Sequence, residues 1–332
     1  SNIKMLDISF NKLNRSIPST FSGLSSVLTL ELSSNHFSGT IPSSLGELVE
    51  LRLLNLEKNQ RLNGTIPHTL GNLKKLVMLN LNANNFSGPI PSSFSSFSSY
   101  RNQQEEQSLE MLTLGDNQLT GSIPSWITNL TKLSSLTLDF NRLTGSIPNG
   151  IGDMQFLTSL ALSDNNLTGT IPTSIGDLTN MRAFTAGANQ LNGTIPTEIG
   201  LLKNVHTFDV SYNSLTGQIP NEIGNMTQLS LATLLQNKLS GTLPSSLRRN
   251  AKLKLFDVGD NRLVGTVPSA LQQLQRLSIL YIYLNDIGGD IDFLCDLEQL
   301  DSIGADCLGD RPEVICRCCH VCCDFRDKCD LA

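Results

Sequence analysis

The chain has 332 residues and a formal net charge of −6 at pH 7, with 24 Lys and Arg against 30 Asp and Glu. An acidic chain whose bases form no cluster argues against nucleic acid or an anionic membrane surface as a partner. No apolar run of about 18 residues occurs, which argues against direct membrane insertion by this stretch.

Asparagine recurs through the chain at a spacing that is usually 24 residues. A period of this length predicts a solenoid of stacked repeats. Apolar residues stand eight, five and three positions before each of these asparagines, and Gly and Ile-Pro usually follow. We predict one solenoid of twelve repeats over residues 1–294, with ladder asparagines at Asn11, Asn35, Asn59, Asn84, Asn117, Asn141, Asn165, Asn189, Asn213, Asn237, Asn261 and Asn285.

Each part of this frame has a physical role. The alternating Leu-x-Leu predicts a short strand with one buried face, and strands of successive repeats then pair in parallel and in register. The Asn amide can satisfy backbone groups in the turn that leaves the sheet, Gly allows a turn conformation closed to other residues, and Pro stops further pairing. Neighbouring repeats must supply the core, because no repeat buries its own apolar face.

The frame closely resembles the plant-specific class of leucine-rich repeats, LxxLxLxxNxLxGxIPxxLGxL, over about residues 3–294. Receptor-kinase ectodomains and secreted polygalacturonase inhibitors contain this class. The resemblance implies an α/β repeat solenoid with a parallel concave β-sheet, short second β-segments and a 3-10 or irregular convex side. It does not name a ligand, because members of the family bind peptides, steroids or whole enzymes.

At its N-terminal end the chain starts inside a repeat. The core positions Leu6, Ile8 and Leu13 would stay exposed without a polar cap, which solenoids need for solubility. We therefore expect a preceding segment or a partner to cover residues 1–13.

The largest break in the period is a polar insertion of nine residues near 98–108, rich in Ser, Gln and Glu. Loops on rigid scaffolds are common binding elements, but a polar insertion is also tolerated on a surface without any function. We favour the second interpretation.

The concave face of the predicted sheet carries an excess of acids. Side chains four, two and one positions before each ladder Asn should point to solvent there, and they include nine acids against one base, Lys58. Such a face suits a basic partner, although acids can also serve only to keep a long sheet face soluble.

Aromatic side chains lie among these acids, and tyrosine is a common anchor of binding surfaces. Packing beneath the C-terminal segment explains two of the tyrosines, at 281 and 283, equally well. The predicted ligand-binding residues are Asp116, Asp139, Phe140, Asp164, Asp209, Tyr212, Asp257, Asp260, Tyr281 and Tyr283.

A second ladder is formed by Thr40, Thr65, Thr170, Thr194, Thr242 and Thr266. Flat threonine arrays of this kind resemble those of ice-binding or crystal-binding β-solenoids. Ordinary strand propensity on an exposed second sheet explains the ladder more simply, so ice or mineral binding is the least favoured function.

All eight cysteines lie in residues 295–332, which we treat as a C-terminal cap. An even number in a segment too short for its own core predicts disulfides and a secretory route, with the pairing left open. A metal site at Cys316, Cys318, Cys319 and His320 is the alternative. The run 312–323 resembles the cap of secreted algal, particularly diatom, leucine-rich-repeat proteins. The predicted disulfide cysteines are Cys295, Cys307, Cys316, Cys318, Cys319, Cys322, Cys323 and Cys329.

Sequons for N-glycosylation agree with secretion, although several arise from the repeat itself. They are Asn14, Asn63, Asn85, Asn129, Asn166, Asn192 and Asn225.

No phosphate loop, metalloprotease motif or nucleophile elbow occurs, and the four histidines are scattered. We therefore expect a secreted or cell-surface protein, without enzymatic activity or a cofactor, that binds a protein, peptide or glycan through its acidic face. A structural, assembly or adhesion role in a cell surface or wall is the alternative.

Overall fold

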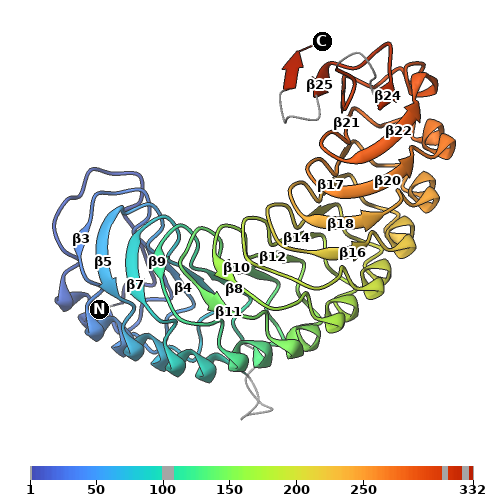
Figure 1. Cartoon of the computed structure of the whole chain (residues 1–332). Coiled ribbons are helices and arrows are strands. Elements are labelled where there is room, and N and C mark those ends of the chain that lie inside the picture. Colours follow the sequence, from blue (N-terminus) through green and yellow to red (C-terminus); the bar gives the residue numbers. More distant parts are fainter. Residues whose placement is uncertain (1, 99–107, 309–312, 324–328, 332) are drawn as a thin grey trace. The chain divides into compact units, whose positions relative to one another are not determined.

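The computed structural model describes residues 2–98, 108–308, 313–323 and 329–331. Residues 329–331 are described by their backbone alone. The chain forms two compact units, Ser1–Leu167 (unit 1) and Thr168–Ala332 (unit 2). Most of the predicted insertion near 98–108 lies outside the described residues. Typical repeats contain one strand of the main sheet, an Asn turn, a short second strand and a 3-10 helix (Figure 1).

The main sheet of unit 1 is parallel, and its strands pair in chain order. Leu6 of the first strand faces Leu30 of the second, so equivalent positions of successive repeats lie side by side. The strands are β1 (Met5–Asp7), β2 (Thr29–Glu31), β4 (Leu53–Asn55), β6 (Met78–Asn80), β8 (Met111–Thr113), β10 (Ser135–Thr137) and β12 (Ser159–Ala161).

Second strands and 3-10 helices of unit 1 follow each Asn turn. The second strands form two small parallel sheets, β3 (Ser38–Gly39), β5 (Arg61–Thr65), β7 (Asn85–Gly88) and β9 (Gln118–Leu119) in one, and β11 (Thr144–Gly145) and β13 (Asn166–Leu167) in the other. The 3-10 helices are η1 (Ser19–Gly23), η2 (Ser43–Glu47), η3 (His68–Asn72), η4 (Ser92–Phe97), η6 (Ser125–Asn129) and η7 (Asn149–Asp153).

Unit 2 repeats the same layers. Its main sheet holds β14 (Ala183–Thr185), β15 (Thr207–Asp209), β17 (Leu231–Thr233), β19 (Leu255–Asp257), β21 (Ile279–Tyr281), β23 (Ser302–Ala305), β25 (Val321–Cys323) and the antiparallel β26 (Cys329–Leu331). Its second sheet holds β16 (Thr216–Gln218), β18 (Lys238–Gly241), β20 (Arg262–Thr266), β22 (Asp286–Asp290) and β24 (Val314–Ile315). Its 3-10 helices are η8 (Thr173–Asp177), η9 (Thr197–Leu201), η10 (Asn221–Asn225), η11 (Ser245–Arg249), η12 (Ser269–Gln273) and η13 (Asp292–Leu294).

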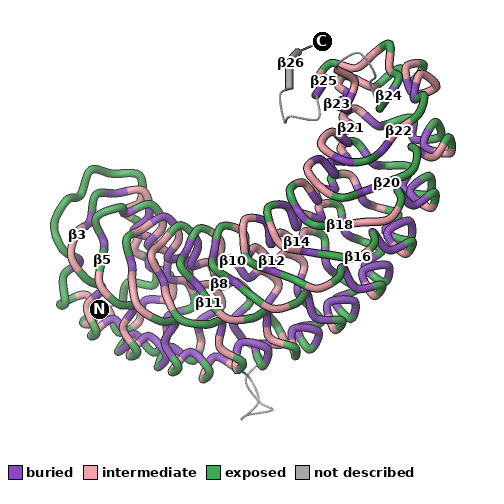
Figure 2. Tube along the Cα trace, viewed as in Figure 1, coloured by how far each residue is buried: buried purple, intermediate pink, exposed green. Residues whose placement is uncertain are grey.

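The core of each unit runs between the main sheet and the 3-10 helices, where Figure 2 shows the buried parts of the tube. From the second repeat on, the two buried apolar residues of each strand frame, such as Leu136 and Leu138, are at most 1% exposed. The predicted solenoid with a many-stranded parallel sheet is therefore confirmed. No helix in the described residues has the length and apolar character that a bilayer span requires.

Each ladder Asn ties two repeats together. In a typical repeat, the Asn237 Nδ2 donates to the carbonyl oxygen of Leu234 at 3.2 Å and to that of Val210, in the preceding repeat, at 3.0 Å. Its Oδ1 accepts from the Leu215 N–H at 2.9 Å. The amide thus satisfies backbone groups that the end of the sheet leaves without a ladder partner, as the sequence predicts.

The first repeat is less covered than the others. Leu6 and Ile8 are half-buried and Leu13 is 40% exposed, whereas the equivalent Leu30 and Leu32 of the second repeat are fully buried.

The cysteine-rich segment extends the sheet as well as closing it. Strand β23 pairs with β21, and the Asp306 carboxylate accepts from the N–H groups of Leu284 and Asn285, which ends the ladder of Asn turns. Disulfides join Cys295 to Cys318, Cys307 to Cys322 and Cys316 to Cys319.

The predicted disulfides are confirmed for these six cysteines, and Cys323 is also disulfide-bonded. The side chain of Cys329 lies outside the described part of the structure. Because Cys316, Cys318 and Cys319 are oxidised, they are no thiolate ligands for the alternative metal site.

The hydrogen bonds of the ladder Asn lead to a first prediction. Asn237→Ala should lower the free energy of unfolding by about 3 kcal/mol, because each unsatisfied buried polar group costs about 1–3 kcal/mol. The matched control is Asn11→Ala, since Asn11 is exposed and its amide bonds only to Ile8 and Ser9; we expect a loss below about 1 kcal/mol. Urea unfolding followed by circular dichroism measures both, and equal losses would contradict a ladder stabilised by buried bonds.

Candidate functional site

The residue immediately before each ladder Asn adopts a left-handed backbone, with φ between 48° and 55°. Asp tolerates this conformation, but an aromatic side chain at positive φ is strained. The turn itself explains the backbone, because all twelve repeats share it. It does not explain why Phe10, Phe140 and Tyr212 occupy the position while remaining 83%, 55% and 49% exposed.

In unit 1 the structure brings together Asp116, Asp139, Phe140 and Asp164, which we call the Asp139 patch. The Asp116 N–H donates to the Asp139 carbonyl at 2.9 Å, and the Phe140 N–H donates to the carbonyl of Ser163 at 2.9 Å. The patch therefore spans three successive repeats.

Asp139 is the least solvated acid of this patch. Its Oδ1 is buried without a hydrogen-bond partner, and it lies over Gly115, where an added Cβ would come within 2.5 Å of that oxygen. Burial raises the pKa of Asp139, and the like charges of Asp164 and Asp116 raise it further. Burial and the neighbouring carboxylates thus make ionisation of Asp139 less favourable.

In unit 2 the predicted residues are Asp209, Tyr212, Asp257, Asp260, Tyr281 and Tyr283, which we call the Tyr283 patch. The rings of Tyr281 and Tyr283 lie 5.6 Å apart. Tyr283 packs over two glycines, since an added Cβ would meet its ring at 2.7 Å from Gly259 and at 2.9 Å from Gly304. The Tyr281 hydroxyl lies 3.2 Å from the Ser302 Oγ.

The packing interpretation of these two tyrosines is confirmed, whereas their role in ligand binding stays a prediction. They pack against β23 of the cysteine-rich segment, and they also remain partly exposed on the sheet face.

The structure corrects one expectation. Asp257, expected to point to solvent, is only 8% exposed. Its Oδ1 accepts from the Gly259 N–H at 2.9 Å, which draws the carboxylate against the backbone beside the Tyr283 ring. Burial raises the pKa of Asp257 to about 6. The hydrogen bond from Gly259 acts to lower this pKa, and the charge of Asp209 acts to raise it. Burial, followed by the charge of Asp257, raises the pKa of Tyr283 to about 12.

The single base among the face positions is already paired. The Lys58 Nζ lies 3.0 Å from Glu57, so it offsets a neighbouring acid, and no base stands at the face positions of the two patches.

The threonine ladder has a packing role. The Thr194 Cγ2 lies 2.8 Å from where a Cβ on Gly217 would stand, and Gly217 has φ of +76°. Glycine is needed there for its backbone and for the methyl group above it. The same contact recurs between Thr170 and Gly193, and the Thr side chains stay exposed.

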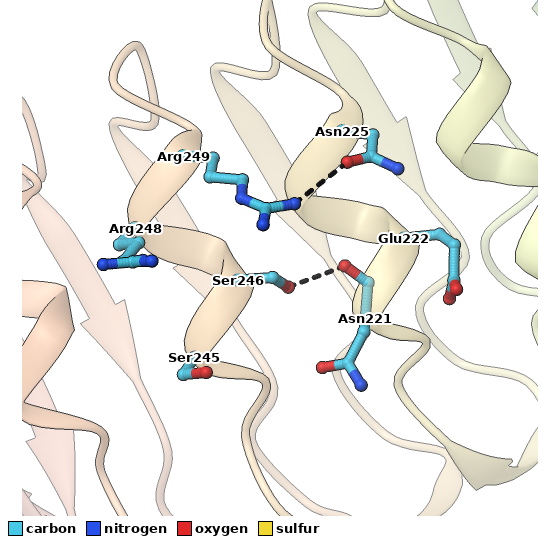
Figure 3. Close-up of a pocket in the computed structure, with 7 residues that line it drawn as sticks. All are labelled: Asn221, Glu222, Asn225, Ser245, Ser246, Arg248 and Arg249. Atoms are coloured by element: carbon cyan, nitrogen blue, oxygen red, sulfur yellow. Dashed lines mark hydrogen bonds between the residues drawn. The ribbon is translucent and has the colours of Figure 1, made fainter.

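A polar groove between η10 and η11 is a feature that the sequence analysis misses (Figure 3). It is lined by Asn221, Glu222, Asn225, Ser245, Ser246, Arg248 and Arg249. Arg249 donates to the Asn225 side chain at 3.3 Å, and the Ser246 hydroxyl donates to the Asn221 carbonyl at 2.6 Å. The adjacent Arg248 and Arg249 were the available sequence signal.

Two family models, both described as leucine-rich repeat, match the sequence. One matches residues 1–60, and the other matches residues 75–97, 108–130, 132–154, 156–178 and 204–226. The chain is a leucine-rich-repeat protein. No curated protein matches its sequence significantly.

Solved structures of plant receptors resemble this leucine-rich-repeat protein. The ectodomain of the Arabidopsis receptor kinase HAESA, in complex with an IDA peptide hormone ligand, is 30% identical at a TM-score of 0.83, over 91% of this chain and 50% of that one. The ectodomain of GASSHO1/SCHENGEN3 from Arabidopsis thaliana, in complex with CASPARIAN STRIP INTEGRITY FACTOR 2, is 32% identical at a TM-score of 0.66, over 91% and 41%. The chain thus spans half or less of these two ectodomains.

A plant ice-binding protein is 29% identical at a TM-score of 0.61, over 79% of this chain and 80% of that one.

The raised pKa of Asp257 leads to the second prediction. Its ordinary pKa is 3.8, so between that value and about 6 the unfolded chain ionises while the folded leucine-rich-repeat protein keeps the proton. Burial of the charge then lowers stability as pH rises, by about 3 kcal/mol above pH 6. Asp257→Asn should raise the melting temperature by about 5 °C near pH 7.5 and change it little near pH 4.

Calorimetry at the two pH values measures this effect, and Asp164→Asn, an exposed acid of the sheet face, is the control. An equal shift at both pH values would contradict the burial of a charge as the cause.

Proposed function

We propose that this protein is an extracellular recognition module that binds a peptide or protein segment through its main-sheet face, without catalysis. The observation that carries the proposal is the choice of exposed Phe140 and Tyr212 at strained left-handed positions. Neither fold stability nor solubility favours an exposed aromatic there, whereas a binding anchor does.

The charge of the same face supports a basic ligand. Burial, followed by the charges of Asp164 and Asp116, raises the pKa of Asp139, and no base lies among the face positions of unit 2. A cationic partner relieves this repulsion and is steered to the face by its field. A peptide fits better than a glycan, because the similar HAESA ectodomain was solved with a peptide hormone ligand.

The sequons support an extracellular setting and a free sheet face. All seven asparagines are exposed, and none lies at a position four, two or one before a ladder Asn. Asn63 and Asn85 lie on paired second strands, while Asn129 and Asn225 end 3-10 helices. Glycans there would leave the proposed binding face uncovered, and the disulfides agree with secretion.

Binding of labelled peptide pools tests the proposal. Fluorescence anisotropy should show that a random peptide pool rich in Lys and Arg binds, that a matched pool rich in Asp and Glu does not, and that binding weakens with added salt. Phe140→Ala and Tyr212→Ala should each cost about 1–3 kcal/mol of binding free energy, mainly through faster dissociation.

Phe156→Ala is the matched control, because Phe156 is 52% exposed but lies outside the sheet face, beneath the Lys132 ammonium at 4.3 Å. Its affinity should match that of the unchanged protein. If the folded Phe140→Ala and Phe156→Ala variants bind the basic pool with equal affinity, the ligand binds elsewhere. An assembly role through other surfaces then becomes the better explanation.

The exposed apolar positions of the first repeat belong to the same proposal. Ile3, Met5 and Phe10 are 45%, 59% and 83% exposed, a surface that a capping segment or a partner would cover.

Ice binding is a second candidate, favoured by the plant ice-binding neighbour and by the exposed threonines of the second strands. The array is not continuous, since Pro89 and Gln218 stand at Thr positions of the ladder. A glycan on Asn63 would lie on the same strand face as Thr65. Absence of thermal hysteresis and of ice-recrystallisation inhibition in deglycosylated protein rejects this candidate.

A further inference from the structure

The carboxylate of Asp257 lies in the main-sheet face, and only one of its two oxygens is bonded within the described part of the chain. The residue is only 8% exposed, and its Oδ1 accepts from the Gly259 N–H. Among the described residues, no donor bonds to Oδ2. An ionised oxygen in this position calls for a donor from outside the chain.

In the described part of the chain, no cation is recorded as acting on Asp257. Asp209 is the charged group that acts on Asp257, and it has the same sign. Tyr281 is the register neighbour of Asp257 on β21, and Asp260, Tyr212 and Tyr281 act on the adjacent Tyr283. The face positions of the five unit-2 repeats that end at Asn189, Asn213, Asn237, Asn261 and Asn285 contain no Lys, Arg or His.

Two aromatic rings stand beside this carboxylate in fixed positions. Tyr283 is seated between Gly259 and Gly304, neither of which has a Cβ that would displace it, and Tyr281 lies 5.6 Å away with its hydroxyl near Ser302. Rings held in this way bind a cation at little entropic cost, because few rotamers remain to be frozen.

We propose that the Tyr283 patch is a subsite for one arginine or lysine side chain of a peptide ligand, with Asp257 as the counter-charge and Tyr281 and Tyr283 as the aromatic wall. The proposal rests on the proposed function, since it names one residue that the recognised peptide must contain. A guanidinium or ammonium donates to Oδ2 and lies against a ring at the same time.

An organic cation fits this subsite better than a metal ion. In the part of the chain that the structure describes, no group of three or more His, Cys, Asp or Glu side chains is placed to hold a metal. Aromatic rings add no ligands for one, whereas they favour a polarisable, weakly hydrated guanidinium.

The tyrosines provide a direct readout, because the chain contains only four. Protein labelled with ring-13C tyrosine is titrated with N-acetyl-arginine amide, N-acetyl-lysine amide and N-acetyl-citrulline amide. Citrulline has nearly the shape of arginine but no charge. We expect the arginine or lysine probe to shift the Tyr281 and Tyr283 signals, assigned with Tyr281→Phe and Tyr283→Phe, and citrulline to leave them in place.

Asp257→Asn is the decisive variant, because Asn can still accept from the Gly259 N–H while losing its charge. It should weaken binding of the cationic probe about tenfold or more, since a hydrogen bond to a charged group is lost. Asp286→Asn is the matched control, because Asp286 is an exposed acid on the second strand β22, outside the main-sheet face; its effect should stay below about threefold. Affinity of the unchanged protein should fall as pH falls through about 6, where Asp257 takes up a proton.

Equal shifts with citrulline, or unchanged affinity in folded Asp257→Asn protein, would overturn the subsite. Its failure is distinguishable from failure of the proposed function. If the basic peptide pool still binds and Phe140→Ala still weakens it, the sheet face binds peptides without this subsite; if the pool does not bind at all, both are wrong.

Discussion

The structure depends most on the hydrogen bonds that each ladder Asn makes to the backbone. One amide bonds the carbonyls of its own turn and of the preceding repeat, and it accepts from the N–H of a neighbouring turn. Each main-sheet strand is only about three residues long, so the backbone hydrogen bonds between strands do little to fix their register. The Asn side chains fix the register, and every repeat must then leave the sheet by the same route.

That route also shapes the surface that we propose as the binding face. The chain can enter the Asn turn only with a left-handed residue before it, so one side chain per repeat is held out from the sheet edge at a fixed angle. The frame constrains the backbone at this position but leaves the side chain free. Phe140 and Tyr212 therefore cost strain without improving the core, and such a cost is expected at a binding surface rather than in a scaffold.

The three surfaces of the repeats carry different roles. The 3-10 helices cover the core, and the second strands pack threonine methyl groups over glycines in successive repeats. Exposed sequon asparagines occur on second strands and 3-10 helices. The main-sheet face alone combines aromatic side chains, carboxylates without a counter-charge and freedom from sequons. We propose this face as the ligand-binding face, and Asp257 with the Tyr281–Tyr283 pair is the part of it that packs against β23.

The sequence by itself determined the repeat architecture, because the Leu-x-Leu and Asn positions act locally and recur with one period. It also indicated the disulfide cap, since cysteines in so short a tail have few other uses. Only the tertiary structure decided the pairing of Cys295 with Cys318, which lie 23 residues apart, and the seat of Tyr283 between Gly259 and Gly304. The burial of Asp257 was likewise invisible in the sequence. Alternation places that residue on the open face, whereas its exposure depends on the Gly259 N–H and on a ring from the next repeat, and contacts between repeats are not encoded in the pattern of any one of them.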